Sequence, residues 1–409
     1  MFIFEKKIIV SKRYLSVVVL CYLVFIIVQA CDNLHPEAID EGELLDGPIE
    51  GLSYAENQQF LKGDIAFNDE IFTVEKGLGP TFVATSCGSC HAGDGKGTPF
   101  STLTRFGQVD ETGNLFLHLG GPQLQNRAIP GYTPETIPFG ATFSKFTPPA
   151  NTGLGFIELV SDTDILAMAD PFDADNDGIS GVPNYIVLPA YQAPFPFAIP
   201  KGGKYIGRFG KKASTYSLHQ QTVNAYNQDM GIASTFNPQD VYSGMNIDPE
   251  VSDKTIADVV FYLRTLKTPI QRDPENNSVK QGQALFTQIS CIKCHVSELK
   301  TSSSSISALS NKKFYPYTDL LLHDMGNALD DGYTEGSAKT YEWRTPALWG
   351  LGLSPKSQGG QYSLMHDGRA KSIEEAIQLH GGEATNSKNK YMQLLSQEKE
   401  AIIKFLKSL

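Results

Sequence analysis

CGSCH at residues 87–91 and CIKCH at residues 291–295 are two copies of one pattern, Cys-x-x-Cys-His. These two motifs contain four of the six cysteines in the 409-residue chain. The other two, Cys21 and Cys31, lie inside and at the end of an apolar N-terminal segment. This distribution leaves no cysteine pair for a disulfide framework, so the motifs themselves must explain the four thiols.

The pattern is typical of covalent haem attachment. Two thiols one helical turn apart add to the two vinyl groups of haem, and the next histidine binds the iron from the proximal side. A zinc site would need four protein ligands in a closed tetrahedron and no histidine at the next position. A redox dithiol would follow a strand of a βαβ unit, which the neighbouring sequence does not indicate. We therefore expect two covalently bound c-type haems, held by Cys87, Cys90 and His91 and by Cys291, Cys294 and His295.

The first 31 residues have the pattern of a bacterial secretion signal. A basic region at residues 6–13 precedes an apolar run at residues 14–30, which is short for a membrane span but long enough for a signal peptide. The run ends in VQAC, which resembles a lipobox and would make Cys31 the lipidated first residue of the mature protein. An uncleaved anchor is the alternative. In both cases we expect an exported protein at the periplasmic face of a bacterial membrane, because bacterial haem c is attached outside the cytoplasm.

Composition and charge narrow the functional classes. The chain is 41% hydrophobic and 19% charged, which is typical of a globular protein. Its net charge of −11 argues against nucleic-acid binding as the main function, since proteins of that class present basic surfaces.

The sequence also indicates an internal repeat with two helical units. Residues 254–266 and 398–409 each place apolar side chains on one helix face, and their ends, FYLRTL and KFLKSL, align aromatic to aromatic and Leu to Leu. We therefore expect a mainly α fold with two cytochrome-c-like haem domains, the first with a large loop-rich insertion. The expected segments are a signal peptide with a lipobox-like end at 1–31, an N-terminal tether at 32–59, a first domain at 60–267 and a second at 279–409.

Four further stretches stand outside the two motifs: GRFGKKA (207–213), PYTDLLLHDMG (316–326), EWRTPALWGLG (342–352) and HDGRAKSIEEAIQLHGGEA (366–384). Together they resemble the bacterial di-haem c-type oxidoreductases that are often labelled thiol-oxidoreductase-like. That family is related to the di-haem cytochrome c peroxidases and to the enzyme that matures methylamine dehydrogenase. One position departs from the family, in which a tryptophan usually follows GRFG, because Lys211 stands there in this chain. Dithiol exchange within this chain is not expected, since haem would occupy all four motif thiols.

A helix that we predict to begin at Ile373 carries the candidate distal ligand of the second iron. Ser372 opens a capping-box pattern, and the apolar face of the helix ends at His380. The related peroxidases place the distal ligand of this haem fourteen residues after the histidine of an HDG-type motif, and the same count from His366 reaches His380. We therefore expect His380 to bind the second iron opposite His295, with His366 in a supporting role. The rival ligands are Met365, Met325 and His323.

For the first iron the sequence singles out no distal ligand. Peroxide chemistry needs an open iron with an acid or base nearby to move a proton. Glu158 stands in an otherwise apolar run, and the related peroxidases use a distal glutamate, so Glu158 is the candidate catalytic residue. The alternative is an ordinary surface glutamate at a helix end. If this iron has a sixth protein ligand, the candidates are His118, His219 and Met230.

DADNDGISG at residues 173–181 resembles the first half of a calcium loop. Asp173, Asp175 and Asp177 alternate before a glycine, as calcium ligands do. The twelfth position holds Asn184 instead of glutamate, so the loop is not a complete EF-hand. A calcium ion between the haems of the related peroxidases makes calcium a candidate ligand here, and an exposed acidic turn is the alternative.

These features together predict an exported, peroxidase-like di-haem oxidoreductase that passes electrons from a periplasmic donor between two haems to an oxidant such as peroxide. The alternative is a non-enzymatic di-haem electron-transfer cytochrome. A third reading, oxidation of another protein, would use Trp343 and Trp349 as relay stations. The expected partners are a periplasmic electron-donor or acceptor protein, peroxide or a similar small oxidant, and a membrane reached through the lipid anchor, with no nucleic acid.

Overall fold

The computed structural model describes Tyr22 and residues 40–409, while residues 1–21 and 23–39 lie outside the described part. The expected signal peptide apart from Tyr22, its lipobox cysteine and residues 32–39 of the expected tether therefore fall outside it. The N-terminal 43 residues and residues 44–409 form two separate units, and the second unit contains both Cys-x-x-Cys-His motifs. No helix among the described residues is long and apolar enough to span a membrane.

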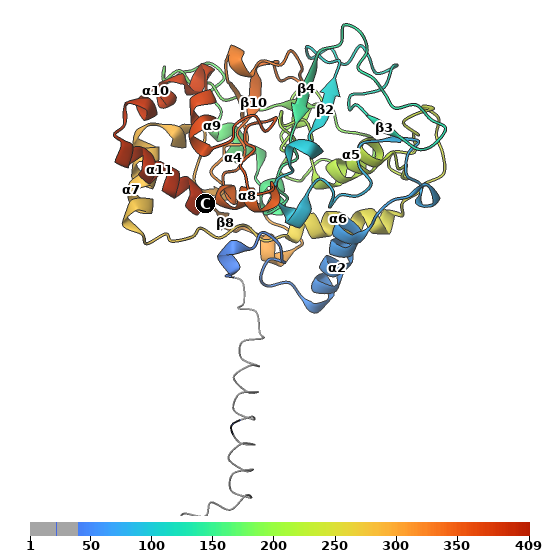
Figure 1. The fold of residues 1–409 in the computed structure, drawn as a ribbon, viewed down its shortest axis with the longest axis horizontal. Coiled ribbons are helices and arrows are strands. Elements are labelled where there is room, and N and C mark those ends of the chain that lie inside the picture. The colour runs from blue at the N-terminus through green and yellow to red at the C-terminus, as the bar shows by residue number, and fades with distance from the viewer. Residues whose placement is uncertain (1–21, 23–39) are drawn as a thin grey trace, which may run out of the picture. The chain divides into compact units, whose positions relative to one another are not determined.

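The second unit combines helices with short strands (Figure 1). Helix accounts for 35% of the structure and strand for 11%, so the helical part of the expectation holds but the fold is mixed rather than mainly α. The helices are α2 Tyr54–Asp64, α3 Leu154–Glu158, α4 Asp162–Met168, α5 Leu218–Met230, α6 Asp253–Thr265, α7 Asn277–Gln288, α8 Ser354–Ser357, α9 Ile373–Leu379, α10 Thr385–Gln393 and α11 Ser396–Ser408. The strands are β1 Thr81–Phe82, β2 Leu103–Phe106, β3 Arg127–Ala128, β4 Phe143–Phe146, β5 Tyr185–Ile186, β6 Tyr205–Ile206, β7 Leu299–Lys300, β8 Lys313–Phe314, β9 Leu322–Asp324 and β10 Glu342–Arg344.

Several helices begin where the sequence supplies a side chain to cap free backbone N–H groups. Ser252 accepts a hydrogen bond from the N–H of Thr255 at the start of α6. Ser372 accepts one from the N–H of Glu375 at 3.0 Å, so α9 begins at Ile373, as predicted. The reciprocal bond of a capping box does not form there, because the carboxylate of Glu375 accepts from the N–H of Lys371.

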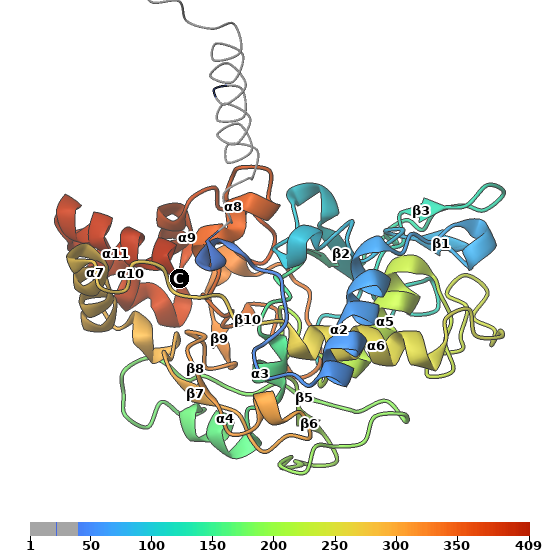
Figure 2. The same cartoon turned by 90° about the horizontal axis from the view of Figure 1, so that it is seen from below.

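Two helix pairs, α2 with α6 and α7 with α11, pack in the same way (Figures 1 and 2). A β-carbon added to Gly63 of α2 would lie 2.1 Å from the carbonyl oxygen of Asp258 in α6. A β-carbon added to Gly282 of α7 would lie 2.0 Å from the carbonyl oxygen of Ala401 in α11. Glycine therefore allows each pair of helix backbones to touch, and the contacted residues stand at matching positions of the two aligned closing helices.

The apolar side chains gather in two main cores, one for each helix pair. The larger core contains the buried faces of α2, α5 and α6, and the smaller one those of α7, α9 and α11. Figure 2 shows the α7–α11 pair and the α2–α6 pair at opposite sides of this unit. The domain boundaries that we expect near residues 267 and 279 stay a prediction.

The strands form five two-stranded antiparallel sheets in the loop-rich parts of the chain. Pairing of β9 with β10 places His323 opposite Trp343, so two of the family-like stretches lie side by side. The loop before α5 joins them, because the N–H of Arg344 donates to the carbonyl of Lys211 at 3.0 Å. These short pairings assemble segments that the helix pairs alone would leave apart.

Candidate haem-attachment sites

Each Cys-x-x-Cys-His motif forms a single helical turn. The N–H of His91 donates to the carbonyl of Cys87, and the N–H of His295 donates to the carbonyl of Cys291, both at 3.0 Å. All four motif cysteines are free thiols and half-buried. The turn therefore holds two thiols and a histidine at the spacing that haem attachment requires.

Both motif histidines are oriented for metal binding by the same kind of hydrogen bond. Nδ1 of His91 bonds to the carbonyl oxygen of Pro149 at 2.9 Å, and Nδ1 of His295 bonds to that of Tyr317 at 3.0 Å. A carbonyl can only accept, so Nδ1 carries the proton and Nε2 has a free lone pair. Burial lowers the pKa of both imidazoles to about 4, which keeps them in the neutral form that binds a metal. These residues fit a haem iron.

The aromatic surroundings of the two histidines also match. The ring of Phe67 lies 6.0 Å from that of His91 at an interplanar angle of 51°, and the ring of Phe286 lies 6.0 Å from that of His295 at 50°. Each phenylalanine also packs on an aromatic residue of the closing helix, with a centroid distance of 5.5 Å to Tyr262 in α6 or to Phe405 in α11. Each helix pair thus carries the packing for one motif.

His380 lies close to the second motif histidine. It is the C-terminal cap of α9, and its Nδ1 bonds to the carbonyl of Ala376 at 2.7 Å, which leaves Nε2 free. Besides burial, the charge of His380 lowers the pKa of His295, so the two imidazoles lie within electrostatic range of each other. Ligation of one iron by His295 and His380 stays a prediction.

Among the rival ligands, His323 has no free ring nitrogen. Its Nε2 bonds to Asp319 at 2.8 Å and its Nδ1 to Glu383 at 2.6 Å. The methionine rivals, Met325 and Met365, pack on the apolar cluster around Trp343. Of the histidines near the second motif, this leaves His380 with a nitrogen for the metal.

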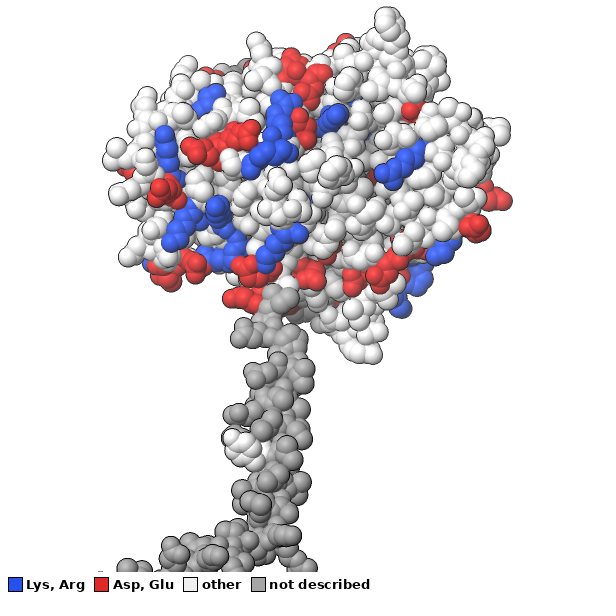
Figure 3. Space-filling view, viewed as in Figure 1, with Lys and Arg blue, Asp and Glu red and all other residues white. Residues whose placement is uncertain are grey.

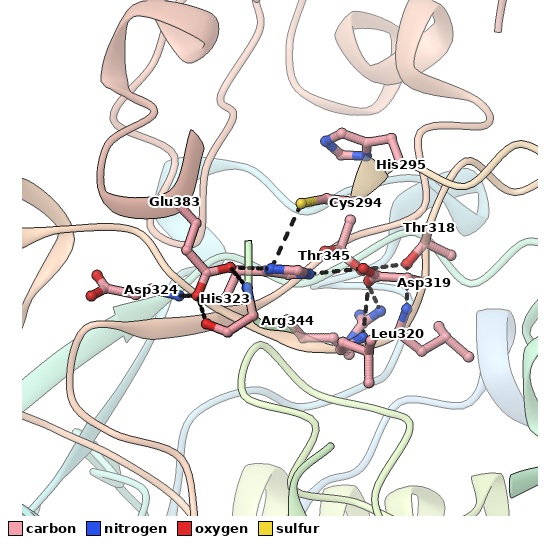
Figure 4. A network of polar contacts seen from close by, with 12 residues as sticks. Cys294, His295, Thr318, Asp319, Leu320, His323, Asp324, Arg344, Thr345 and Glu383 are labelled. Carbon is pink, nitrogen blue, oxygen red and sulfur yellow. Dashed lines mark hydrogen bonds and ion pairs between the residues drawn. The ribbon is translucent and has the colours of Figure 1, made fainter. Parts of the chain in front are cut away.

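A polar network beside the second motif surrounds His323 (Figure 4). Burial disfavours a charged imidazole, but hydrogen bonds with Asp319, Cys294 and Glu383 outweigh it and raise the pKa of His323 well above its ordinary value. His323 is therefore a buried imidazolium between two carboxylates. Glu383 also accepts from the hydroxyl of Ser180 at 2.7 Å, which ties the acidic loop before Ser180 to this network. The sequence did not single out Asp319 or Glu383, because their roles depend on contacts with His323.

A second polar network lies beside the first motif. Burial, followed by the negative charge of Asp229, raises the pKa of Cys90 to about 11, so Asp229 lies close to this thiol. The carboxylate of Asp229 accepts a hydrogen bond from the amide of Gln123, and burial raises its pKa to about 6. Arg105 joins this network through Gln228 at 3.1 Å and forms an ion pair with Glu335. The sequence analysis did not identify these residues.

Glu158, the candidate catalytic residue, lies at the end of α3 with 2% of its side chain exposed. Its Oε2 accepts from Nε of Arg264 at 2.6 Å, and its Oε1 accepts from the N–H of Leu218 at 2.7 Å. The surface alternative is therefore wrong. Both carboxylate oxygens are occupied, and a proton-transfer role would require the Arg264 contact to loosen.

The candidates for a distal ligand of the first iron lie in different surroundings. His118 is exposed. His219 packs edge-on against the rings of Tyr191 and Phe236, with centroid distances of 5.5 and 4.6 Å. Met230 is a buried core residue at the end of α5. No contact in the described residues links any of the three to His91.

The acidic loop brings three carboxylates together, but not the three that the sequence predicted. Oxygens of Asp170, Asp173 and Asp175 lie within 4.8 Å of one another. Asp177 instead forms an ion pair with Lys293, which stands inside the second Cys-x-x-Cys-His motif. The loop is therefore anchored to the second motif by a lysine.

His366 supports the loop around it. Its Nε2 bonds to Asp331 at 2.8 Å, and its ring stacks on that of Trp343 at a centroid distance of 3.7 Å. The ammonium of Lys212 lies 3.8 Å from the centroid of the same indole and donates to three backbone carbonyls. A cation so close disfavours a positive hole on Trp343, which argues against this residue as a relay station.

Comparison with known proteins identifies the family. A family model described as "Di-haem oxidoreductase, putative peroxidase" matches residues 145–409. A solved structure of hydrazine synthase from Kuenenia stuttgartiensis, pressurised with 20 bar of xenon, is 15% identical, covers 92% of this chain and 94% of its own, and has a TM-score of 0.38. No curated protein matches the chain. The family match covers more than half of the chain and includes the second Cys-x-x-Cys-His motif, so this protein belongs to the di-haem oxidoreductase family.

Proposed function

We propose that this chain is an exported c-type di-haem oxidoreductase that is peroxidase-like and acts between a periplasmic electron donor and an oxidant such as peroxide. Its lipid anchor at Cys31 would hold it at the periplasmic face of the membrane. The observation that carries the haem assignment is the matched pair of motif histidines. Each has Nδ1 bonded to a backbone carbonyl at 2.9 or 3.0 Å and Nε2 free to bind iron. Bound haem would supply a redox-active iron at each site.

The two haems would have different tasks. His295 and His380 would bind the second iron from both sides, as their electrostatic interaction and free Nε2 atoms suggest. A six-coordinate iron suits electron relay, and two imidazole ligands give a lower reduction potential than imidazole with thioether. The first iron, held by His91, would then be the reacting one.

Reduction of one peroxide to two waters consumes two electrons, supplied by the donor, and two protons. We propose Glu158 as the group that transfers a proton, as the resemblance to the peroxidases suggests. Asp229 is a second candidate, because it lies beside the attachment thiol of Cys90 and because burial brings its pKa to about 6, near that of an effective acid–base catalyst. Glu158→Gln and Asp229→Asn, compared at equal haem content, separate the two candidates by which one abolishes peroxide turnover.

Mass spectrometry and the pyridine haemochrome spectrum test the haem assignment in the exported chain. We expect two covalent haems, and one after the pair Cys291→Ala and Cys294→Ala. Peroxide-dependent oxidation of a reduced small c-type cytochrome then tests the activity. A chain that carries two haems but does not react with peroxide would refute the peroxidase function and favour a non-enzymatic electron-transfer cytochrome.

That alternative is a non-enzymatic electron-transfer cytochrome. The ion pair with Arg264 and the hydrogen bond from the N–H of Leu218 favour it, since they already give the buried carboxylate of Glu158 structural partners. EPR of the oxidised protein distinguishes the two functions. A high-spin signal that changes on addition of peroxide supports the enzyme, and two unreactive low-spin signals support the carrier.

We also propose a calcium ion in the acidic loop. The oxygens of Asp170, Asp173 and Asp175 lie close enough to share one cation. Lys293 competes with calcium there, because its ammonium pairs with Asp177 and lies 3.8 Å from Asp175. Calorimetry on chelator-treated protein should detect calcium binding, with a higher affinity after Lys293→Met. Absence of binding in both proteins would refute the site.

A further inference from the structure

Three basic side chains act on one another electrostatically: Lys96, Lys211 and Arg344. Nε of Arg344 donates to the carbonyl of Gly210 at 2.9 Å and its N–H to that of Lys211 at 3.0 Å, so Arg344 packs on the turn that carries Lys211. Burial, followed by the positive charges of Lys96 and Arg344, lowers the pKa of Lys211 to about 7. Burial alone lowers the pKa of Lys96 to about 8 and also that of Arg344 to about 10. Like charges so close repel each other, and this arrangement therefore calls for anions between them.

The protein itself supplies no anion for this cluster. Among the described residues, neither Lys96 nor Lys211 has an ion pair or a side-chain hydrogen bond, and the guanidinium of Arg344 bonds only to the carbonyls of Gly210 and Thr345. The nearest acids are already engaged. Asp367 bonds to Arg369 at 2.7 Å, and Asp319 bonds to His323 at 2.8 Å.

The cluster reaches toward both motif histidines. The charge of Lys211 contributes to the lowered pKa of His91, so Lys211 lies near the first motif. Arg344 lies beside Asp319 in the network of the second motif (Figure 4), and the charge of Asp319 in turn acts on His295. Backbone bonds fix this geometry, since the N–H of Arg344 donates to the carbonyl of Lys211.

We propose that Lys96, Lys211 and Arg344 form a cradle that binds haem propionates between the two haems. The inference rests on the proposed function, because it requires the haems. Each haem carries two carboxylates on one edge, and burying them is costly unless cations and hydrogen-bond donors accompany them. The cations of the cradle are themselves buried without a negative partner. Pairing them with the propionate carboxylates therefore lowers the cost of burying both charges.

Lys211 has a specific part in this cradle. It stands where the family usually has tryptophan, and an indole has no charge with which to compensate a carboxylate. The exchange would add a positive charge near the first haem. A nearby cation favours the reduced form of haem iron, so Lys211 and Lys96 should raise the reduction potential of the haem whose propionates they bind.

The test compares haem-loaded variants of the chain. Four change the cradle: Lys211→Met, Lys211→Arg, Lys211→Trp and Lys96→Met. The control is Lys62→Met, at an exposed position of α2. Haem content is measured first, and each haem is then titrated spectroelectrochemically. We expect Lys211→Met, Lys211→Trp and Lys96→Met to lower the potential of one haem and shift its propionate bending band in the resonance Raman spectrum. Lys211→Arg should retain the wild-type values, and Lys62→Met should change nothing.

Three results would overturn the inference. Haem-loaded variants with unchanged potentials and unchanged propionate bands would refute it while leaving the proposed function intact. Inorganic phosphate that shifts the potential of wild type, but not that of Lys211→Met, would show an open site for free anions in place of a propionate cradle. A wild-type chain without haem would refute the proposed function and the inference with it. Lys96→Met and Lys211→Arg keep the test available if Lys211→Met fails to retain haem.

Discussion

The ion pair between Glu158 and Arg264 gives the sharpest prediction, because it separates a structural from a catalytic glutamate. Glu158→Gln keeps the shape of the side chain and one acceptor for the N–H of Leu218, but it removes the charge that Arg264 faces at 2.6 Å. Arg264→Gln removes the same interaction from the other side. The double variant completes a thermodynamic cycle that isolates the pair.

The structure sets the expected size of the coupling. Removing one partner of a fully buried ion pair costs about 3–5 kcal/mol, because the other charge stays buried without compensation. Glu158 is 2% exposed, but the side chain of Arg264 is 33% exposed, so water can solvate the guanidinium once its partner is gone. We therefore expect a coupling of about 2 kcal/mol, in the range of hydrogen bonds to charged groups.

The assay is guanidinium unfolding of the haem-loaded chain, followed by tryptophan fluorescence, which haem quenches in the folded state. Lys280 and Glu275 provide the control, since they form an exposed ion pair at the start of α7. Because the side chain of Glu275 is 89% exposed and that of Lys280 is 52% exposed, Glu275→Gln should change the free energy of unfolding by less than about 1 kcal/mol.

A coupling of below about 0.5 kcal/mol would refute the reasoning, because water would then replace the ion pair at no cost. Peroxide turnover completes the comparison. If the role of Glu158 is only to form the ion pair with Arg264, Glu158→Gln and Arg264→Gln should each lose peroxide turnover in proportion to their loss of stability. If Glu158 transfers the proton, Glu158→Gln should lose turnover at unchanged haem content while Arg264→Gln retains part of it.

Three further predictions concern other parts of the chain. His380→Ala should convert the second haem from low spin to high spin in EPR, and an unchanged low-spin signal would exclude His380 as the ligand. The pKa of His323 is higher in the folded state than in the unfolded state. Its contribution to stability should therefore be complete below about pH 6.5 and decline as the pH rises through the folded-state pKa. The difference in unfolding free energy between wild type and His323→Gln should accordingly shrink between pH 6 and pH 9. Gly282→Ala should destabilise the chain by about 3 kcal/mol, the upper end of the usual cost of overpacking, because the added methyl carbon would lie 2.0 Å from the carbonyl oxygen of Ala401. Gln281→Ala, at an exposed neighbouring position, should be nearly neutral, and equal unfolding midpoints for the two variants would contradict the close helix crossing.

The sequence predicted features that depend on near neighbours in the chain. The turn of each Cys-x-x-Cys-His motif needs only five residues, and the start of α9 at Ile373 needs only the hydroxyl of Ser372. Periodicity likewise placed α6 and α11 within two residues of their observed starts. Family membership followed from long local stretches.

Features that depend on distant partners could not be predicted. The strands are too short to show an alternating pattern, and their partners lie up to forty-seven residues away, as with Thr81 and Ala128. The role of Glu158 changed because Arg264, 106 residues further along, binds it. The same holds for His323, whose partner Glu383 comes from the loop after α9. A residue type alone does not reveal which charge will stand beside it.

The matched packing of the two motif histidines has a consequence for biosynthesis. A chain is made from its N-terminus, so His91 emerges long before Tyr262, the helix residue that packs on its neighbour Phe67. Tyr262 follows His91 by 171 residues, whereas Phe405 follows His295 by 110, so the packing around the first motif is completed after a longer stretch of synthesis. If haem is attached covalently as we propose, attachment would accordingly have a longer time window at the first site than at the second.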